Sequence, residues 1–258
     1  MSAAGPLLAA RALAVRGGAR TLVEALELEL ASGEFLALLG RNGSGKTLLL
    51  HTLAGLRPAD AGEAMLGGDA LMALPRREAA RRLALLPQDL EEMPGATVLD
   101  AVLTGRYAHQ GAFGADAPGD LPLALQALRR LGIEGLAARE LTSLSGGEQR
   151  RAAAAATLAQ QAPVVLLDEP TNHLDPHHQL ALLEVFAAHA RDGGAVLASL
   201  HDPTLAARYA DRVLLLHGDG RWECGRAAQL LNAATLSALY LTDIVEVERD
   251  GRRIFAAG

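Results

Sequence analysis

Apolar and polar residues alternate with the two-residue period of a β-strand through the first part of the chain. The alternation covers residues 7–39, as in the run "LELELASGEFLALL", with turn residues at Gly17-Gly18 and Ser32-Gly33. Successive side chains of a strand point to opposite faces, so this pattern predicts short strands. They lead into a wholly apolar, buried strand at Phe35–Leu39, which ends at a glycine-rich loop.

The pattern then changes to the spacing of an α-helix. Four leucines after the loop are spaced for one buried helical face: Leu49, Leu50, Leu53 and Leu56. Arg57-Pro58 is expected to end this helix. From about Gln88 to Gln161 the pattern is again mostly helical, broken at "MPGAT", "GAFGADAPGD" and "LSGGEQRR". We therefore expect an inserted helical subdomain in this part of the chain.

Three apolar, strand-like runs follow, separated by helical stretches: Val164–Leu167, Ala195–Leu200 and Arg212–Leu216. Strands that alternate with helices are typical of a parallel α/β sheet with both faces covered. The tail, Gly220–Gly258, alternates short helix and strand signals.

Composition narrows the range of partners. The formal net charge of -6 gives the chain no general attraction to nucleic acid or anionic lipid, so a polyanion must bind at a local site. The single cysteine, Cys224, excludes an internal disulfide framework and suits a reducing compartment. The N-terminal residues lack the order of a signal peptide, and no apolar run reaches the roughly 18 to 20 residues of a membrane helix. A membrane is therefore expected to be reached through a partner.

The stretch "GRNGSGKT" is the first candidate site. It fits G-x-x-x-x-G-K-[ST] between a predicted strand and a predicted helix, where backbone N–H groups wrap a polyphosphate. Its members are Gly40, Arg41, Asn42, Gly43, Ser44, Gly45, Lys46 and Thr47. Lys46 would neutralise the β and γ phosphates, and Thr47 would offer a hydroxyl to Mg²⁺. The alternative, a chance glycine-rich turn, is disfavoured by the flanking strand and helix.

A second candidate lies in "VVLLDE". The apolar residues predict a buried strand with Asp168 and Glu169 at its carboxyl end, beside the phosphate loop if the two strands are neighbours. Asp168 suits coordination of Mg²⁺ through water, and Glu169 suits polarising the water that attacks the γ phosphorus. Two acids that only cap a helix or lie in solvent are the alternative. Together the two stretches predict ATP hydrolysis.

The stretch "LSGGEQRR" reads as a phosphate-binding turn without a lysine of its own. Ser145, Gly146 and Gly147 present a hydroxyl and backbone N–H groups at a predicted helix start. Taken alone, Ser145 with Glu148 three residues later is better explained as a helix capping box. The cap and a phosphate site are compatible on the same residues.

Six motifs occur in the order found in the ABC ATPase superfamily, and the chain resembles that family over essentially its whole length. They are "GRNGSGKT", Gln88 in "LLPQD", "LSGGE", "VVLLDEP", "TNHLD" and His201 in "SLHD". The resemblance implies an α/β P-loop NTPase with a RecA-like core, an N-terminal antiparallel β subdomain and an inserted α-helical subdomain. The implied division is residues 1–87 and 162–220 for the core with the β subdomain, 88–161 for the helical subdomain, and 221–258 for a C-terminal extension.

The same resemblance implies roles for individual residues. Gln88 matches the glutamine that senses Mg²⁺ and couples the helical subdomain to the core, and His201 matches the histidine that contacts the γ phosphate. The expected catalytic residues are Lys46, Gln88, Glu169 and His201, and the expected Mg²⁺ ligands are Thr47, Gln88 and Asp168.

Members of the family pack two copies head to tail, so that a loop of one copy closes over the ATP held by the other. The resemblance therefore implies a homodimer. The residues expected to act across its interface are Ser145, Gly146, Gly147, Glu148 and Asp175, which matches the D-loop aspartate.

Two further features bear on ligand binding. The family usually stacks an aromatic residue on adenine, whereas the matching position is Gly17, so Arg16 or Arg20 is the expected substitute because guanidinium planes also stack on bases. His173 and His177 have the spacing of metal ligands on a helix, but Asp175-Pro176 between them is typical of a helix start and argues against that site.

Weaker resemblances point to the ATPases of metal-chelate importers, which carry ferric siderophores, cobalamin or haem. They lie in the stretches 103–114, 174–186 and 200–216. By analogy we expect a homodimer on the cytoplasmic face of the inner (plasma) membrane, beneath two membrane permease subunits. A groove near Gln88, with the segment up to about Tyr107, would receive the permease, and a substrate-binding protein would deliver the chelate.

Three alternatives remain open at this point. The first is an ABC ATPase that serves the import of another solute or serves export. The second is a non-transport ABC protein that acts in DNA repair or on ribosomes, and the third is a soluble P-loop kinase or GTPase. The single phosphate loop, the lack of a heptad insert and the negative charge disfavour the non-transport class, and no nucleic-acid partner is expected. A soluble P-loop kinase or GTPase would lack "LSGGE" and His201.

Overall fold

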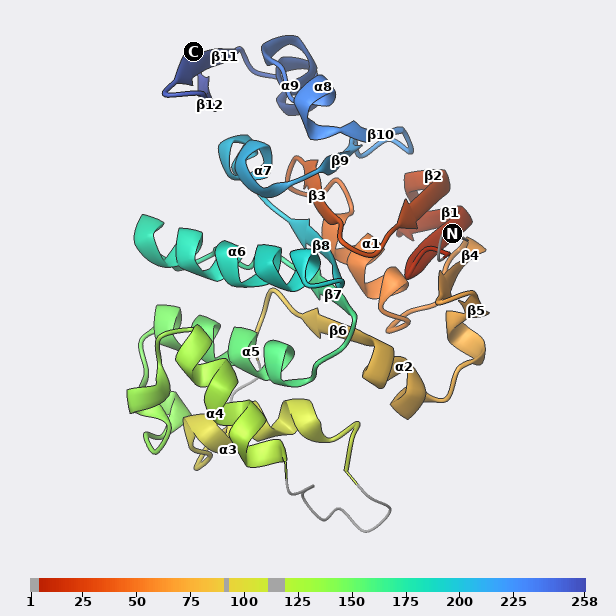
Figure 1. Ribbon diagram of the computed structural model, residues 1–258. Helices are drawn as coiled ribbons and strands as arrows, with labels where there is room; N and C mark the ends of the chain where they lie inside the picture. The colour runs from red at the N-terminus through yellow and green to blue at the C-terminus, as the bar shows by residue number, and fades with distance from the viewer. Residues whose placement is uncertain (1–4, 91–92, 111–118) are drawn as a thin grey trace.

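A six-stranded sheet crosses the middle of the molecule (Figure 1). All its strand pairings are parallel except one, which joins the two strands that come last along the chain, Arg212–Leu216 and Trp222–Arg226. The computed structural model describes residues 5–90, 93–110 and 119–258. The strand order is β10 (Trp222–Arg226), β9 (Arg212–Leu216), β3 (Phe35–Gly40), β8 (Ala195–Ser199), β7 (Val164–Leu167) and β6 (Leu83–Leu86). The predicted parallel α/β sheet is confirmed, and β10 completes its edge although the sequence division ends the core at residue 220.

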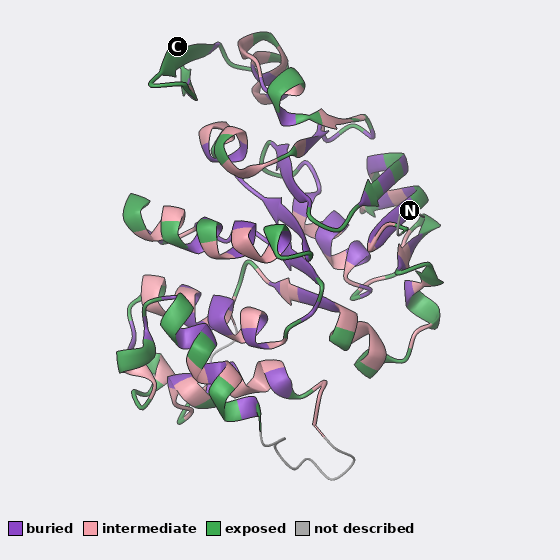
Figure 2. Ribbon diagram, viewed as in Figure 1, coloured by how far each residue is buried: buried purple, intermediate pink, exposed green. Residues whose placement is uncertain are grey.

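Both faces of this sheet are covered, which explains why its strands are apolar throughout. On one face, Leu38 of β3 packs with α1 (Lys46–Leu53); on the other, Ala37 packs with α5 (Gly146–Ala159) and α6 (Pro176–Arg191). Figure 2 shows the central strands buried while the outer helices carry exposed residues. A strand with two buried faces loses the polar–apolar alternation and reads as a continuous apolar run.

A second, antiparallel sheet packs beside the first. Its strands are in the order β2 (Arg20–Leu30), β1 (Leu8–Gly17), β4 (Ala61–Leu66) and β5 (Asp69–Ala70). Alternate residues of β2, such as Leu26 and Leu28, are buried against α1 and β3, while Glu27 is exposed. The predicted N-terminal antiparallel β subdomain is therefore confirmed.

The helix after the glycine-rich loop is shorter than predicted. It ends at Leu53, and Gly55 has a φ of +68°, a left-handed conformation that turns the chain out of the helix. Leu56 is 59% exposed as a result, so the expectation that it shares the buried face of Leu49 and Leu53 is wrong.

A group of helices lies between β6 and β7, as the helical spacing predicts. It contains α3 (Val98–Leu103), α4 (Asp120–Arg130) and α5. Arg106 and Asp120 are held inside this group, with side chains 7% and 1% exposed and Nε donating to Oδ1 at 2.8 Å. Arg106 Nη1 also donates to the carbonyl oxygen of Ala159 at 2.8 Å, which ties the pair to α5.

The remaining elements are short. They are α2 (Arg76–Arg82), α7 (Pro203–Tyr209), α8 (Ala227–Leu230), α9 (Ala233–Tyr240), the hairpin β11 (Ile244–Arg249) with β12 (Arg252–Ala257), and the 3₁₀ turns Leu71–Ala73, Thr104–Arg106, Glu134–Leu136 and Leu141–Ser143. The hairpin packs on α7, where the N–H of Phe255 donates to Thr204 Oγ1 at 3.1 Å. The helix and strand signals of the tail are thus confirmed.

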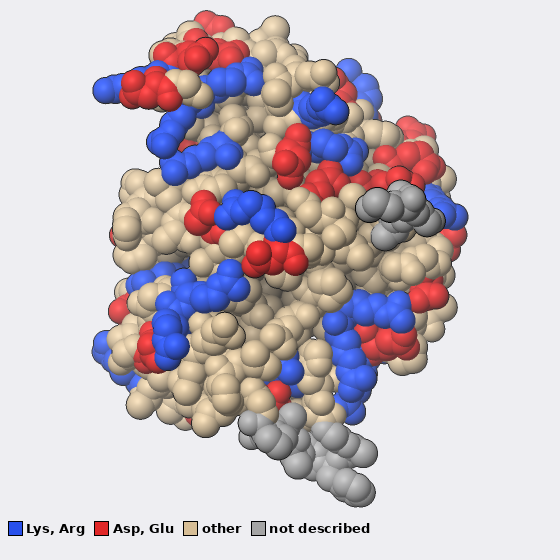
Figure 3. All heavy atoms as spheres, in the orientation of Figure 1, with Lys and Arg blue, Asp and Glu red and all other residues tan. Residues whose placement is uncertain are grey.

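No helix in the described ranges combines the length and the apolar character needed to cross a membrane. Figure 3 shows basic and acidic side chains interspersed over the viewed face. The basic side chains on this face lie in separate strips beside acidic and uncharged ones.

Replacing Asp120 by Ala should lower the free energy of unfolding by about 3 kcal/mol, because it leaves the buried Arg106 guanidinium without its ion-pair partner. Asp120→Asn is the matched control: it keeps an oxygen acceptor and should lose clearly less. Urea unfolding followed by circular dichroism measures both, and equal stability of the Ala variant and the wild type would contradict the expected role of the pair.

Candidate functional site

The glycine-rich loop joins β3 to α1 in a conformation that few side chains permit. A Cβ added at Gly40 would lie 2.5 Å from Ser44 Oγ and 2.7 Å from the carbonyl oxygen of Leu216, so only glycine fits there. Gly45 precedes α1 with a φ of +100°, in the region that favours glycine. The loop borders a hollow of about 290 Å³, whose lining includes Asn42, Gly43 and Thr47.

Lys46 lies at the start of α1 with its ammonium group folded into the loop. Its Nζ donates to the carbonyl oxygens of Gly40 at 2.9 Å and Arg41 at 3.3 Å. Burial lowers the pKa of Lys46, and the carboxylates of Glu169 and Asp168 act in the opposite direction. The cation is thus held by neutral carbonyl groups, and Lys46 lines the same hollow as Asn42, Thr47 and Glu169.

The two predicted carboxylates follow β7, and Ser199 at the end of β8 fixes both. Ser199 Oγ donates to Asp168 Oδ1 at 2.7 Å and accepts from the N–H of Glu169 at 2.8 Å. Both acidic residues are buried, and β7 and β8 are parallel neighbours. β8 separates β7 from β3, so the two strands are not neighbours as the prediction required. Glu169 nevertheless lines the same hollow as Lys46, because parallel strands of one sheet all end at the same edge.

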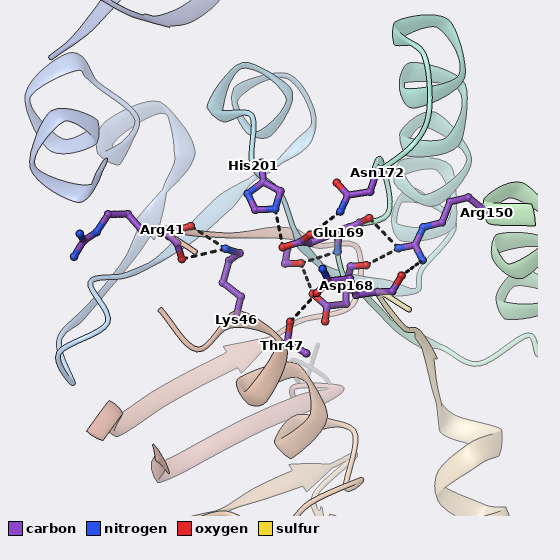
Figure 4. Close-up of polar contacts among 11 residues, drawn as sticks. Arg41, Lys46, Thr47, Arg150, Asp168, Glu169, Asn172 and His201 are labelled. Carbon is purple, nitrogen blue, oxygen red and sulfur yellow. Dashed lines mark hydrogen bonds and ion pairs between the residues drawn. The ribbon is translucent and has the colours of Figure 1, made fainter. Parts of the chain in front are cut away.

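Glu169 has both carboxylate oxygens engaged. Oε1 lies 2.6 Å from Nε2 of His201, and Oε2 accepts from Nδ2 of Asn172 at 2.6 Å. The Glu169 side chain is 10% exposed and that of His201 is 43% exposed. Figure 4 shows Lys46, Thr47, Asp168, Glu169 and His201 converging from three separate segments of the chain.

The residues expected to hold Mg²⁺ suit a divalent cation. Asp168 Oδ2 is buried and, within the described ranges, has no hydrogen-bond donor. A buried carboxylate oxygen without a donor keeps its lone pairs for another ligand, and carboxylate, amide and hydroxyl oxygens are the ligands that Mg²⁺ prefers. Thr47 Oγ1 donates to Gln88 Oε1 at 3.4 Å, which brings the other two expected ligands together.

A second hollow, of about 510 Å³, lies at the start of α5. It is lined by Ser145, Gly146, Gly147, Glu148, Arg151, His173, Leu174, Asp175 and His178. The predicted capping box is confirmed: the N–H of Ser145 donates to Glu148 Oε2 at 2.8 Å, and the N–H of Glu148 donates to Ser145 Oγ at 3.4 Å. The Ser145 hydroxyl also donates to Glu148 and lowers the pKa of that carboxyl.

Asp175 caps α6 at the edge of the second hollow. Its Oδ1 accepts from the N–H of His178 at 2.9 Å, and this bond lowers the pKa of Asp175. The helix begins at Pro176, so His173 and His177 do not share one helix, as the sequence indicates. No cluster of three or more potential metal ligands occurs among the described residues.

The two hollows share no lining residue within the described ranges. One contains Lys46, Thr47, Gln88 and Glu169, and the other contains Ser145 to Glu148 with Asp175. A single chain therefore brings together the predicted phosphate-loop and carboxylate residues, while the predicted interface residues form a separate group.

The candidate base-binding residues lie at the end of β1 and the start of β2. Arg20 Nη2 donates to the carbonyl oxygen of Gly218 at 3.2 Å. A Cβ at Gly17 would lie 2.8 Å from Cδ1 of Leu22, which itself lines the first hollow. A base platform at Arg16 or Arg20 stays a prediction.

Three residues that support the site have no individual signal in the sequence. Asn172, Ser199 and Arg150 all lie inside the motifs "TNHLD", "SLHD" and "LSGGEQRR", and that position is the only indication of their importance. Asn172 and Ser199 hold the carboxylate residues. Arg150 donates only to main-chain carbonyl oxygens among the bonds observed here, a role that residue type does not reveal.

Comparison with known proteins gives a consistent result. The family model described as ABC transporter matches residues 23–172. The hemin import ATP-binding protein of Deinococcus radiodurans is 40% identical over 93% of this chain and 92% of its own length. The cobalamin import ATP-binding protein of Halobacterium salinarum is 38% identical over 85% of this chain, which spans only 55% of that relative.

Solved structures agree with the sequence relatives. A putative metal-chelate type ABC transporter in an inward-facing conformation superposes with a TM-score of 0.84 and 27% identity, covering 98% of this chain and 97% of its own. A dimeric bacterial ABC transporter cassette superposes with a TM-score of 0.73 and 25% identity, covering 84% and 97%.

Lys46 is the only lysine in the sequence, so its ammonium group can be observed alone. In protein labelled with [ε-¹³C]lysine, we expect the titration midpoint of this residue to lie below the ordinary lysine value of 10.5, because burial disfavours the charged form. A triphosphate bound in the hollow should raise the midpoint through its negative charge. Lys46→Arg, which removes the signal, is the assignment control, and a midpoint at or above 10.5 in the free protein would contradict the buried placement.

Proposed function

We propose that this chain, which belongs to the ABC transporter ATPase family, is the ATP-hydrolysing subunit of a metal-chelate importer. The observation that carries the proposal is the pair of separate hollows. One combines a phosphate loop with two buried carboxylates, and the other offers a helix start without a lysine. A soluble kinase or GTPase would need only the first of these.

In this proposal the phosphate loop holds the ATP phosphates. Backbone N–H groups of Gly43 to Thr47 surround them, and the Lys46 ammonium exchanges its carbonyl partners for the β and γ phosphate oxygens. Thr47, Gln88 and Asp168 would hold Mg²⁺, whose chemistry here is to neutralise charge on the phosphate oxygens. The buried, donor-free Asp168 Oδ2 supports that assignment.

Glu169 is the proposed general base. It accepts a proton from the water whose oxygen forms a bond to the γ phosphorus, and the bond from that phosphorus to the β–γ bridging oxygen breaks to leave ADP and phosphate. Asn172 keeps one carboxylate oxygen in place, and His201 lies against the other. His201 is half exposed at the mouth of the site, where its ring can contact the γ phosphate.

A second copy of the chain completes the site in this proposal. Ser145, Gly146 and Gly147 of the partner would close over the triphosphate with a hydroxyl and backbone N–H groups, while Glu148 and Asp175 stabilise the two helix starts. Support comes from the separation of the two hollows and from the dimeric cassette of similar fold.

The proposed permease contact is an apolar hollow of about 610 Å³ beside the phosphate site. Pro87 and Asp89, which flank Gln88, line one side of it, and Leu56 and Ala153 lie in its wall. A helix end of the permease seated there would touch the segment that carries Gln88. The helical part, residues 88–161, would then move with the permease, since ATP closes the dimer and hydrolysis reopens it.

The relatives support the proposed cargo and location. The names of the similar proteins specify hemin and cobalamin import, and the similar transporter is of metal-chelate type. We therefore propose that the chain is a peripheral protein on the cytoplasmic face of the inner membrane, bound to permease subunits. A substrate-binding protein would deliver the chelate to those permease subunits. Part of the stretch 103–114, one basis of the subclass, lies outside the described residues.

Glu169→Gln should retain ATP binding, lose roughly 10²- to 10⁴-fold in hydrolysis rate, and accumulate as an ATP-bound dimer, because the amide no longer accepts the proton. Size-exclusion chromatography with light scattering and a phosphate-release assay measure the two effects. Adding Ser145→Arg to this variant should abolish the dimer but not ATP binding. A Glu169→Gln protein that hydrolyses ATP normally, or stays monomeric with bound ATP, would count against the shared site.

The cargo is tested with the whole transporter. Affinity-tagged protein should co-purify with a membrane permease, and the complex in vesicles should take up one of ferric siderophore, cobalamin or haem when ATP is inside with the ATPase. The same vesicles carrying Glu169→Gln are the matched control and should show no ATP-dependent uptake. Uptake of none of the three, in a complex that hydrolyses ATP, would reject metal-chelate import while leaving the ATPase assignment intact.

A further inference from the structure

Arg150 is a buried cation in the second turn of α5, and it is only 2% exposed. Its guanidinium donates to carbonyl oxygens in two distant segments. Nη1 donates to the carbonyl oxygens of Pro87 and Gln88, the second at 3.1 Å. Nη2 donates to the carbonyl oxygens of Asp168 and Glu169, the second at 2.9 Å. Nε donates to the carbonyl oxygen of Pro170 at 3.3 Å. Figure 4 shows this side chain reaching toward Asp168 and Glu169.

The carbonyl groups that Arg150 binds belong to the residues that act on the nucleotide. Gln88, Asp168 and Glu169 each accept from the guanidinium through a main-chain oxygen, so these bonds fix their backbone and do not use their side chains. Five N–H donors in a fixed plane suit such a task, because one group can span both segments. Burial without a directly bonded carboxylate lowers the pKa of Arg150 to about 10, so the placement costs solvation energy that simple packing does not require.

Glu169 has a main-chain conformation that needs such support. Its φ is +47°, a left-handed value that a residue with a Cβ rarely adopts and that costs of order 1–3 kcal/mol. The N–H of Glu169 donates to Ser199 Oγ, and its carbonyl oxygen accepts from Arg150. The strained peptide is therefore held on both sides.

The same helix carries the residues of the second hollow. Ser145 caps α5, and Arg150 lies little more than one turn further along it. A short, rigid path thus joins the helix start to the main chain of Gln88 and Glu169.

We propose that Arg150 is a positioning residue for hydrolysis, which fixes the main chain of Gln88, Asp168 and Glu169 to helix α5. The proposal rests on the proposed ATPase function. It implies that closure over a nucleotide at Ser145 is transmitted to the carboxylates of the same chain through this one side chain. A purely structural role would instead affect stability without selectively affecting the hydrolysis step.

Arg150→Lys tests the proposal, because one ammonium group keeps the charge but does not span both segments. We expect the rate of ATP hydrolysis at saturation to fall roughly 10- to 100-fold, while affinity for ATP changes less than about 3-fold. Arg106→Lys is the matched control: it is also a buried arginine that donates to a carbonyl oxygen of α5, but it is bonded to Asp120. It should lose stability and keep its hydrolysis rate within about 3-fold.

Hydrogen exchange gives a readout that does not depend on activity. Peptides covering residues 164–175 and 83–90 should exchange faster in Arg150→Lys than in the wild type. Their exchange rate in Arg106→Lys should equal that of the wild type. If the wild-type chain hydrolyses no ATP, the proposed function fails while the exchange result still decides the anchoring. Equal exchange in all three proteins, or equal losses of affinity and rate in Arg150→Lys, would overturn the proposal. Arg150→Gln serves the same comparison if the lysine variant does not fold.

Discussion

The parallel alignment of the central strands is the constraint on which the site depends. Four segments far apart in the sequence leave the sheet at the same edge: the loop after β3, the turn after β6, the carboxylates after β7 and His201 after β8. Because the parallel strands of one sheet all end at this edge, Lys46, Gln88 and Glu169 meet although they lie far apart in the sequence. The buried apolar strands fix this geometry, so the chemistry at the edge rests on packing at the centre.

Charges at this edge are balanced mainly by main-chain dipoles and polar side chains. Lys46 and Arg150 are both buried, and their observed hydrogen bonds go to carbonyl oxygens, while Asp168 takes a donor from Ser199. A direct ion pair between Lys46 and a carboxylate would neutralise both groups and leave the cation less available to phosphate. Holding each charge with neutral partners keeps it available for a ligand, at the expense of solvation.

Much of the site could be predicted from local sequence, because most of its functional residues occur in short motifs. Gly40 to Thr47, the Asp168-Glu169 pair and the Ser145–Glu148 cap each depend on residues close together in the chain. Leu56 was misplaced because helical spacing does not reveal that Gly55 leaves the helix. The partners of Arg150, Ser199 and Arg106 are set by tertiary contacts over long sequence separations, which no periodic pattern contains.

The separation of the two hollows is itself informative about assembly. If Ser145 to Gly147 bind phosphate as proposed, they have little use to their own chain, because their hollow shares no residue with the one that holds Lys46. Its capping box satisfies two groups at the helix start and leaves further N–H groups for an anion. A partner that brings its own triphosphate would supply that anion, and a second copy of this chain is the simplest such partner. In the proposed dimer two equivalent sites would form together, so that neither chain would close over a nucleotide without the other.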